Sequence, residues 1–468
     1  MVFALGRLFV SYYLARRHER CQDAVRRFLR RGFRRANPQR RLIGTVFGFV
    51  IYWRVYVRRM DGAGGIYPLD AALGLTRDGF SMCVISLMGR LSTLVSYDQV
   101  GALLLTFMMW SPSKTSIEKT VLGLGRFTAA WFRMAPPPQG DGEVLVIQFD
   151  SKATPTATDS ELQKRRGKRR PNPFPGSRRH RGRELRRQRG PKRRRRKGDK
   201  SKNGKAATLV VMYTLKRAFD RRRRPLLLGP INVWRYASYA PKRHAFAIAR
   251  REATKRGFPK ASGKTIQIVM DGDEDLELYA REFFPEATLT LDIAHALEKL
   301  WIAGECLFKE GSQPLEVWIG SMKGLLYSGK GSALVAKLRK ALDDIPKTGP
   351  GNKGKRERLS SVIAYLNRRI HMMDYGVLRE QDLEIASGMV EGAVKHVIAK
   401  RFDNGSMRWI KERAEPLLQL RCIEINGHWD AFISFVEQRL EERTEARLAL
   451  QRLLQTKPAP LPTLGIIT

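Results

Sequence analysis

Two segments of the sequence have the pattern of a buried strand followed by a carboxylate. In "EVLVIQFDSKATP" (143–155), five of the six residues before Asp150 are apolar, and "KTIQIVMDGDEDL" (264–276) leads in the same way to Asp271. Apolar runs rich in β-branched residues are typical of strands covered on both faces. In open α/β sheets, reactive groups collect beyond the carboxyl ends of the strands. We therefore expect Asp150 and Asp271 to face each other if their strands are neighbours.

Such a pair of carboxylates predicts a metal site. Two carboxylates side by side repel, and one tends to take up a proton unless a cation lies between them. Oxygen ligands suit Mg²⁺ or Mn²⁺. A third carboxylate would complete a two-metal site, in which ions roughly 3.5–4 Å apart stabilise the attacking and leaving oxygens of a phosphoryl displacement. The best candidate is Glu391, at the edge of the apolar stripe of the helix "GMVEGAVKHVIAKRF".

Simpler explanations exist for each of these carboxylates. An Asp after a strand is most often a turn former or a helix cap, and a Glu in the first turn of a helix complements the helix dipole. The choice of residue is also open. Asp273, Glu274 and Asp275 crowd Asp271, and Asp292 ends another predicted strand in "ATLTLDIAHALEKLW".

The charge of the chain indicates a polyanionic partner. Its 468 residues carry a formal net charge of +42, and such a charge destabilises a compact protein unless counterions or a polyanion neutralise it. Nucleic acid is the leading candidate, ahead of an anionic membrane surface. Residues 161–205 hold 22 Lys and Arg against three acidic residues, a net of +19, which leaves +23 of the +42 for the rest of the chain. Nucleic-acid binding is therefore not expected to depend on this run alone.

The Arg/Lys run itself is predicted to be a disordered insertion over residues 156–205, because Pro, Gly, Ser and Asn are spread through it and almost nothing in it is apolar. It is either a solvated segment or a phosphate-binding one that adds affinity without sequence preference. The second interpretation is favoured because the run loops out of the hairpin that starts at Asp150. The candidate DNA contacts in the run are Arg165, Arg166, Arg169, Arg170, Arg193, Arg194, Arg195 and Arg196.

The cysteine usage and the apolar runs indicate a cytoplasmic protein. Cys21, Cys83, Cys306 and Cys422 are scattered without a C-x-x-C pair, so neither a zinc ribbon nor a disulfide framework is predicted. No uninterrupted apolar run approaches the roughly 20 residues of a membrane span. We expect a protein of the bacterial cytoplasm that associates with the nucleoid.

Strands alternate with helices after a helical front end, which predicts an α/β protein. Inside the front end, "SYDQVGALLLTFMMW" and "SKTSIEKTVLGLG" are helical patterns separated by "SPS". The pair is either a helix-turn-helix, with Lys114 and Lys119 as DNA contacts, or an ordinary helical hairpin. The predicted regions are basic helices and short strands (1–62), the helical front end (63–137), a core (141–300 plus 380–412), a helical insertion (301–379), and C-terminal helices with a tail (413–468).

Several motifs, in order from about Arg41 to Phe435, resemble the ISKra-type insertion-sequence transposases. They are "VIQFDSKATPT", "VMDGDEDL", "LDIAHALEKLW", "ASGMVEGAVKHVIAKRF" followed by "SMRW", and "INGHWDAF". Proteins of this family are DDE enzymes with a ribonuclease H-like core. The resemblance implies Asp150, Asp271 and Glu391 as catalytic residues and as ligands of two Mg²⁺ or Mn²⁺ ions. It also implies a mixed sheet flanked by helices, a helical insertion before the last catalytic residue, and a mainly helical N-terminal region.

The resemblance suggests supporting residues around this triad. The Asp292-x-x-His295 element resembles one that supports the site in several DDE families, although a histidine here is otherwise a core residue. Lys395 and Arg408 either touch backbone phosphates or belong to a solvated helix face. The family usually has a cysteine pair before the Gly-rich turn, where this chain reads "YVRRMDGAGG", so no zinc is expected.

The function that the resemblance implies is transposition. Such an enzyme binds the ends of its own insertion sequence, cleaves double-stranded DNA and joins the ends to a target, which requires a homodimer or a larger assembly on DNA. Two alternatives stay open at this point. One is a catalytically inactive or repurposed nucleic-acid-binding protein, and the other is a metal-dependent nuclease on the same core.

Overall fold

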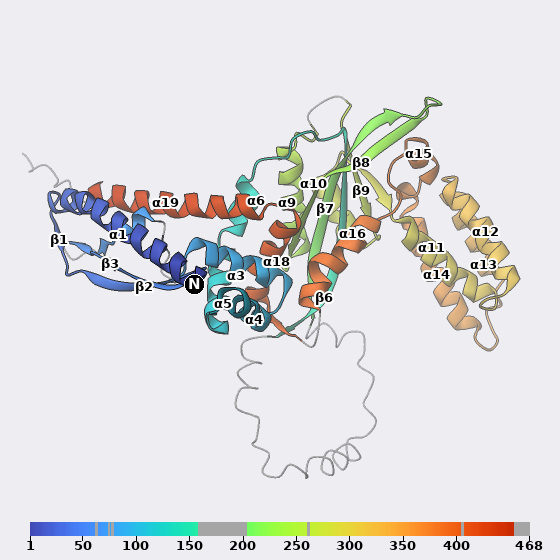
Figure 1. Ribbon diagram of the computed structural model, residues 1–468. Helices are drawn as coiled ribbons and strands as arrows, with labels where there is room; N and C mark the ends of the chain where they lie inside the picture. Colours follow the sequence, from blue (N-terminus) through green and yellow to red (C-terminus); the bar gives the residue numbers. More distant parts are fainter. Residues whose placement is uncertain are drawn as a thin grey trace, which may run out of the picture. The chain divides into compact units, whose positions relative to one another are not determined.

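The structure is a computed structural model that describes residues 1–60, 64–73, 75, 79–157, 204–259, 263–403 and 407–453 (Figure 1). The predicted DNA contacts between Arg165 and Arg196 lie outside these ranges. The chain forms two compact units, Met1–Phe132 with Gly427–Thr468, and Arg133–Asn426. Among the described helices, none combines the length and the apolar character that crossing a membrane requires.

The first unit combines a long helix with small sheets and a helical group. Its elements are α1 (Val2–Leu29), β1 (Phe33–Arg35), β2 (Gln39–Thr45), β3 (Gly48–Arg54), β4 (Val57–Arg59), β5 (Gly65–Ile66), α2 (Pro68–Ala72), α3 (Met82–Leu94), α4 (Tyr97–Met108), α5 (Lys114–Gly125), α6 (Thr128–Met134) and α19 (Trp429–Leu453). Strands β2 and β3 form an antiparallel hairpin, and β1, β4 and β5 form a second small sheet.

A buried carboxylate organises the strands of this unit. Asp70, at the start of α2, accepts hydrogen bonds from Tyr52 Oη at 2.6 Å, from Arg41 Nη1 at 2.6 Å and from Arg54 Nη1. Its side chain is only 11% exposed. A buried charge is tolerated where it is paired and hydrogen-bonded, so this cluster ties α2 to the β2–β3 hairpin.

The two predicted helical patterns of the front end form α4 and α5, which pack against each other and against α3. Ser96 caps α4 through a capping box with Gln99, and Ser113 caps α5. Lys114 is exposed and pairs with Asp98 at 2.6 Å, which joins the two helices. Lys119 is also exposed. A DNA-reading role for this pair stays a prediction.

The C-terminal segment is divided differently from the predicted region 413–468. Helix α18 (Lys411–Ile425) lies in the second unit, whereas α19 lies in the first. The reason is the packing of Trp429, which is 2% exposed and whose Nε1 donates a hydrogen bond to Ser86 Oγ at 2.9 Å. Its ring lies so close to Gly89 that an added Cβ there would be 2.9 Å from it. A composition-based boundary does not detect contacts between residues this far apart in the chain.

The second unit is a mixed α/β domain. Its strands are β6 (Val144–Ala157), β7 (Gly204–Phe219), β8 (Pro225–Ser238), β9 (Thr265–Met270), β10 (Thr288–Leu291) and β11 (Trp409–Ile410). The sheet order is β10-β9-β6-β7-β8, and β11 pairs with β6. The pairs β10–β9, β9–β6 and β11–β6 are parallel, whereas β6–β7 and β7–β8 are antiparallel. This arrangement is compatible with a ribonuclease H-like fold.

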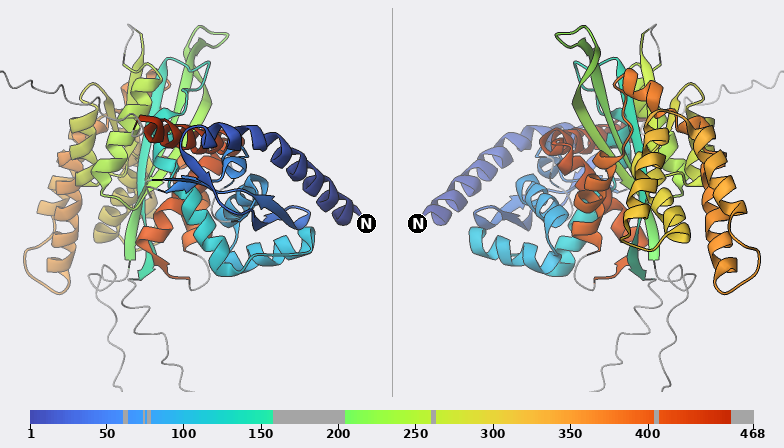
Figure 2. Two further views of the ribbon diagram at one scale, coloured as in Figure 1. Left: turned by 90° about the vertical axis from the view of Figure 1, so that its left-hand side faces the viewer. Right: turned by 90° about the vertical axis from the view of Figure 1, so that its right-hand side faces the viewer.

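Helices cover both faces of this sheet (Figure 2). On one face, α9 (Lys242–Lys255) and α10 (Glu274–Phe283) pack together, and Phe149 of β6 stacks on Phe246 of α9 with ring centroids 3.8 Å apart. On the other face lie α18 and a helix that begins as α16 (Gly388–Ala393) and continues as a π-helical turn, Val394–Ala399. Because successive strand residues point to opposite faces, the neighbours of Phe149 on β6 point toward α16.

Helices beyond the β10 edge form the region predicted as a helical insertion. They are α11 (Ile293–Leu307), α12 (Gln313–Tyr327), α13 (Gly331–Asp343), α14 (Asn352–Arg368) and α15 (Tyr375–Glu380). Helix α11 packs against α12 and α14, and α13 packs against α12 and α14. Their buried faces carry Leu300, Leu338 and Leu359 at close to zero exposure, so this region has an apolar core of its own.

Candidate active site

Asp150 lies in the middle of β6, not at the end of a strand as predicted. The antiparallel pairing with β7 continues past it as far as Pro155 opposite Gly204. The parallel pairing with β9 stops two residues earlier, at Gln148. Asp150 is therefore at the rim of the parallel part of the sheet, where the neighbouring strand has ended, although its own strand runs on. Its Oδ1 accepts a hydrogen bond from Ser151 N at 2.6 Å.

Asp271 follows the last residue of β9 and is held by the helical insertion. Its backbone carbonyl accepts a hydrogen bond from Tyr365 Oη of α14 at 2.7 Å, and the next carbonyl, of Gly272, accepts one from the Arg369 guanidinium. Gly272 has φ +78° and lies so close to this clamp that a Cβ would be 2.5 Å from Tyr365 Oη. Only glycine adopts this conformation without strain. The side chain of Asp271 also accepts from Asp273 N at 2.9 Å, as a turn former does.

Glu391 reaches the sheet because the segment before it is bonded to β6. The decisive residue is Gln148, the one polar residue among the six that precede Asp150, with no exposed surface. Its Oε1 accepts a hydrogen bond from Val390 N at 2.9 Å, and its Nε2 donates to Ala386 O at 3.3 Å and to Tyr213 Oη at 3.2 Å. Gln148 therefore fixes the start of α16 two residues from Asp150 along β6.

A second buried glutamine, Gln267 of β9, anchors the same segment farther upstream. Its Oε1 accepts from Glu384 N at 3.1 Å, and its Nε2 donates to Glu384 O at 2.7 Å and to Thr290 Oγ1 at 2.9 Å. Next in line, Ile385 O accepts from Ile293 N at 2.9 Å. Residues 384–390 are thus bonded almost residue by residue to β6, β9 and the start of α11. An unpaired backbone group in this buried place would cost about 1–3 kcal/mol.

Asp292 acts both as a helix cap and as a support for His295. It caps α11 by accepting from Ala294 N at 2.9 Å, and it accepts hydrogen bonds from Ser387 Oγ and from His295 Nδ1, the latter at 3.1 Å. Burial alone raises the pKa of Asp292, but the hydrogen bonds from His295, Ser387 and Ala294 bring it below its ordinary value. The pKa of His295 is raised, chiefly by its hydrogen bond to Asp292.

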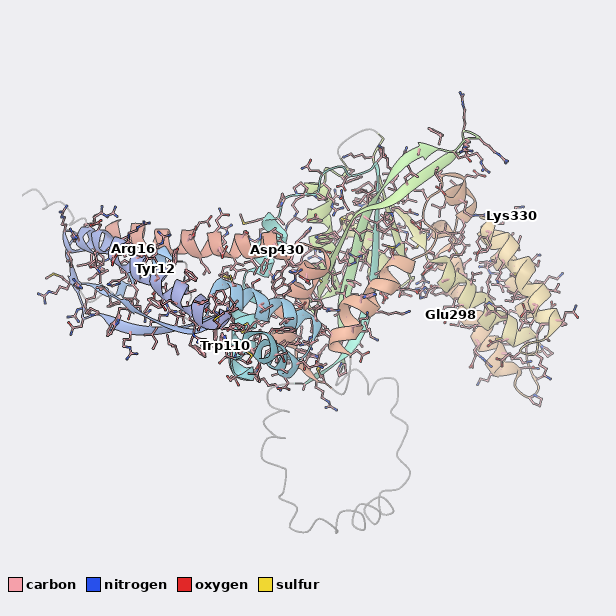
Figure 3. All side chains as sticks on the ribbon, in the orientation of Figure 1. Tyr12, Arg16, Trp110, Glu298, Lys330 and Asp430 are labelled. Carbon is pink, nitrogen blue, oxygen red and sulfur yellow. The ribbon has the colours of Figure 1, made fainter. Side chains whose placement is uncertain are left out.

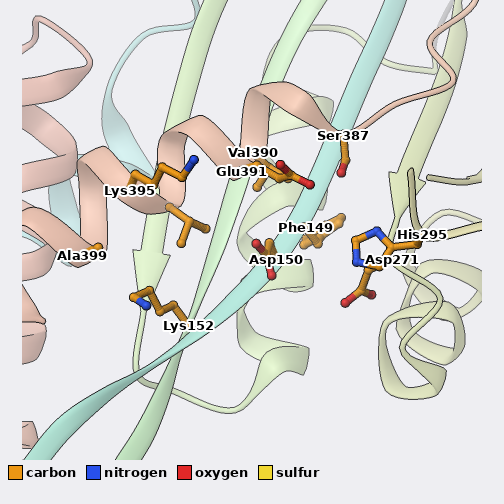
Figure 4. Close-up of a pocket in the computed structure, with 11 residues that line it drawn as sticks. Phe149, Asp150, Lys152, Asp271, His295, Ser387, Val390, Glu391, Lys395 and Ala399 are labelled. Atoms are coloured by element: carbon orange, nitrogen blue, oxygen red, sulfur yellow. The ribbon is translucent and has the colours of Figure 1, made fainter. Parts of the chain in front are cut away.

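These elements surround one cavity of about 330 Å³ (Figure 4). Asp150, Asp271 and Glu391 all line it, and Figure 4 shows them on three sides of the same space. Glu391 comes from α16, Asp150 from the middle of β6, and Asp271 from the turn after β9. The other lining residues are Phe149, Lys152, His295, Ser387, Val390, Val394, Lys395 and Ala399.

The three carboxylates interact electrostatically. Burial raises the pKa of Asp150 above its ordinary value, and the negative charges of Asp271 and Glu391 raise it further. Its hydrogen bond from Ser151 N and the nearby His295 act in the opposite direction. A buried carboxylate facing two others is stabilised by a cation or a proton.

The cavity also has a cationic side. Lys395, one of the candidate supporting residues, lines it, and so does Lys152, which sequence reasoning missed. Lys152 lies two residues after Asp150 on the same strand, and this spacing places both side chains on one face. Its Nζ pairs with Asp403 at 3.0 Å. Arg408 is exposed and is not among the residues that line the cavity.

The donor set fits a hard divalent cation. No group of three His, Cys, Asp or Glu within the described ranges already has the arrangement of a metal site. The three carboxylates nevertheless supply only oxygen donors, which Mg²⁺ and Mn²⁺ prefer. Asp150 is partly buried and carries an unfavourable charge there, and the cavity has room for ions with several waters.

Comparisons with known proteins add little to this geometry. No family model matches the chain, and no curated protein matches it. Among solved structures, the Drosophila P element transposase strand transfer complex is similar to this chain. The match has 11% sequence identity and a TM-score of 0.22, and it covers 79% of this chain and 83% of that chain.

Proposed function

We propose that this protein is a DDE-type transposase that cleaves double-stranded DNA at the ends of an insertion sequence and joins the ends to a target. The observation that supports it best is the cavity shared by Asp150, Asp271 and Glu391. Carboxylates from three separate elements, converging on one space beside two lysines, suit chemistry on a phosphodiester. The motifs that resemble ISKra-type transposases point to the same three residues.

Each lining residue has a role in this proposal. Asp150, Asp271 and Glu391 would hold two Mg²⁺ or Mn²⁺ ions, which when bound supply Lewis-acid activation of the nucleophile and stabilisation of the leaving oxygen. Lys395 would bind a phosphate of the DNA as a point charge, and Lys152 would do so after exchanging its ion pair with Asp403. His295 is held by Asp292 through Nδ1, so its other ring nitrogen is available to the substrate side of the cavity.

The buried hydrogen-bond network keeps these groups in register. Gln148, Gln267 and the Asp292–Ser387 pair hold residues 384–390, and Tyr365 with Arg369 holds the backbone at Asp271. Catalytic groups need placement to within about 0.5 Å, which packed and hydrogen-bonded supporting residues provide. Joining two DNA ends requires two active sites, so we propose a homodimer or larger assembly on DNA.

The proposal is tested with supercoiled plasmid carrying the DNA that flanks the coding region on both sides. We expect Mg²⁺-dependent nicking and joining by the wild-type protein, and loss of both by more than 100-fold in Asp150→Asn and Glu391→Gln. The matched control is Asp275→Asn, which removes a carboxylate four residues from Asp271 whose side chain is 68% exposed.

Each outcome has a defined meaning. Nicking that survives both substitutions would refute the site. Nicking without joining of labelled ends to a target plasmid would identify a nuclease. DNA binding without any Mg²⁺-dependent or Mn²⁺-dependent cleavage would identify a protein that binds DNA only.

A further inference from the structure

The β7–β8 hairpin extends beyond the sheet at the end away from the candidate active site (Figure 1). Strand β6 begins at Val144, which pairs with Leu215 of β7. Beyond this point β7 and β8 pair only with each other, from Lys216 opposite Leu228 to Phe219 opposite Pro225. The exposed part of the hairpin is therefore a two-stranded β-ribbon.

The tip of this ribbon is strongly basic. The segment 216–224 contains one acidic residue, Asp220, and six exposed basic residues, Lys216, Arg217 and Arg221–Arg224. Its net charge is therefore +5. Figure 3 shows nitrogen-tipped side chains fanning out from this end of the hairpin. Clustered cations repel one another, and a counter-charge on a partner relieves this repulsion.

Hydrogen bonds within the turn hold the residues that carry these arginines. Asp220 Oδ1 accepts from Arg222 N and from Arg224 N, each at 2.8 Å, and its Oδ2 accepts from Arg224 Nε at 2.8 Å. Arg223 has φ +59°, in the left-handed region. Since Arg224 is used to hold the turn, Arg221, Arg222 and Arg223 are the side chains that the turn directs outward for a partner.

The base of the ribbon is also fixed. Glu143 Oε2 accepts from Arg217 N at 2.8 Å, and Asp382 Oδ2 accepts from Leu227 N at 2.6 Å. Arg217 Nη2 donates to Thr265 Oγ1 at 2.8 Å. These bonds join both ribbon strands to the body of the domain, so the tip has a defined position relative to the sheet.

The length of β7 between the candidate active site and the ribbon tip is close to the repeat of DNA. Asp150 pairs with Leu209, and Phe219 lies ten residues farther along β7. At about 3.3 Å per residue the strand between them is at most about 33 Å long, since the irregular pairing of β7 with β8 near Thr214 shortens it. One turn of B-DNA is about 34 Å, or about 10 base pairs. A duplex that contacts both the cavity and the ribbon tip would therefore present about the same groove face to each.

We propose that the tip of the β7–β8 ribbon is a second DNA-binding site, which contacts duplex phosphates about one helical turn from the bond cut in the candidate active site. The major groove admits a two-stranded β-ribbon, and guanidinium groups bind phosphates in a bidentate manner. The inference that the tip contacts DNA phosphates depends only on the charge and geometry of the ribbon. The one-turn spacing also depends on the proposed function, because it needs a cut at the cavity.

The first test measures binding with the charge of the tip removed. In the Asp150→Asn background, Arg221→Gln, Arg222→Gln and Arg223→Gln are combined, and binding to a mixed-sequence 30-base-pair duplex is followed by fluorescence anisotropy against salt concentration. The slope of log K against log salt should fall by about one for each phosphate that the tip no longer neutralises. At 0.1 M salt, each such phosphate should weaken binding roughly eightfold.

The matched control removes the same charge from exposed lysines in the helical insertion, Lys309→Gln, Lys337→Gln and Lys340→Gln. It should change the salt slope little. Equal slopes for the tip variant and the Asp150→Asn protein with its tip arginines intact would overturn the proposal. Equally weakened binding in the tip and control variants would also overturn it, because it would show a general charge effect. Loss of binding to anionic phospholipid vesicles with DNA binding intact would assign the ribbon to a lipid surface instead.

The second test locates the contact. A photo-crosslinking p-benzoylphenylalanine replaces Phe219, which is 72% exposed, and a control carries it at Val317 of α12, which is 68% exposed. We expect a DNA crosslink from the first position and not from the second. On duplexes that carry both a Mg²⁺-dependent nick and a crosslink, the two should lie about 10 base pairs apart. Crosslinks scattered at all spacings would refute the alignment along the sheet, and absence of any nick would refute the proposed function separately.

Discussion

Gln148 offers a sharp test of how the candidate site is built, because it joins β6 to the helix that carries Glu391. The substitution Gln148→Leu keeps a side chain of similar size and removes three buried hydrogen bonds, to Val390 N, Ala386 O and Tyr213 Oη. A buried hydrogen bond contributes about 0.5–1.5 kcal/mol net, so the loss should be about 2–4 kcal/mol. The full cost of an orphaned group does not apply at Val390 N, since it also donates to Ser387 O at 3.0 Å.

The expected consequences are measured in two ways. Thermal unfolding should show Tm lowered by about 4–16 °C, given about 2–4 °C per kcal/mol for large domains. The Mg²⁺-dependent nicking rate, measured at a temperature where the variant is fully folded, should fall roughly 100-fold, because a misplacement of about 1 Å has an effect of this size on catalysis. The Mg²⁺ concentration for half-maximal nicking should rise.

The matched control for Gln148→Leu is Thr214→Val, at the other end of the same sheet. Thr214 is fully buried, and its Oγ1 accepts from Gly142 N at 3.0 Å and donates to Asp141 Oδ1 at 3.2 Å. Removal of this hydroxyl should lower Tm in a similar way without changing the Mg²⁺ dependence. Wild-type nicking by folded Gln148→Leu protein would refute the inference that Gln148 positions Glu391.

Two further predictions concern the metal-free protein in EDTA. Asp150→Asn should raise Tm, because it removes a charge that burial, Asp271 and Glu391 disfavour. The expected gain in stability is about 0.5–2 kcal/mol, and each kcal/mol raises Tm by about 2–4 °C. A lower Tm would contradict this reasoning. The pKa of His295 is raised in the folded protein, so its stabilising effect is complete below its unfolded pKa of about 6.5 and is lost as pH rises through the folded pKa. The Tm advantage of the wild-type protein over His295→Asn should therefore shrink between pH 6 and pH 8.5, and a constant difference would show that protonation of His295 does not stabilise the fold. The lowered pKa of Asp292 does not interfere, since its contribution is lost only in acid, below about pH 4.

The parts of the fold that follow from local pattern were predictable from the sequence. The apolar, β-branched runs before Asp150 and Asp271 predicted strands, and β6 and β9 are strands that lie side by side in parallel. The alternation of strands and helices predicted a mixed α/β domain, which is confirmed. These predictions succeed because the spacing of apolar residues along a segment reports which of its faces are buried.

The supporting structure around the carboxylates was not predictable in the same way. Gln148 and Gln267 appear in the sequence only as polar residues inside apolar strands, a signal of a buried hydrogen-bond partner that does not say which partner. Their partners, in residues 384–390, lie more than a hundred residues away along the chain. Likewise, the position of Asp150 at the rim depends on where β9 ends, which is a property of the pairing and not of β6.

The sequence by itself therefore determined the chemistry that is available, namely three candidate carboxylates, a strong positive charge and the strand type that carries two of these carboxylates. Only the tertiary structure decided that Glu391 faces the same cavity as Asp150 and Asp271, that Lys152 joins them, and that the arginines of residues 221–224 are carried on a ribbon anchored to the body of the domain. The physical reason is that side-chain type and periodicity are local, whereas convergence at a site depends on strand order, register and hydrogen bonds between distant segments.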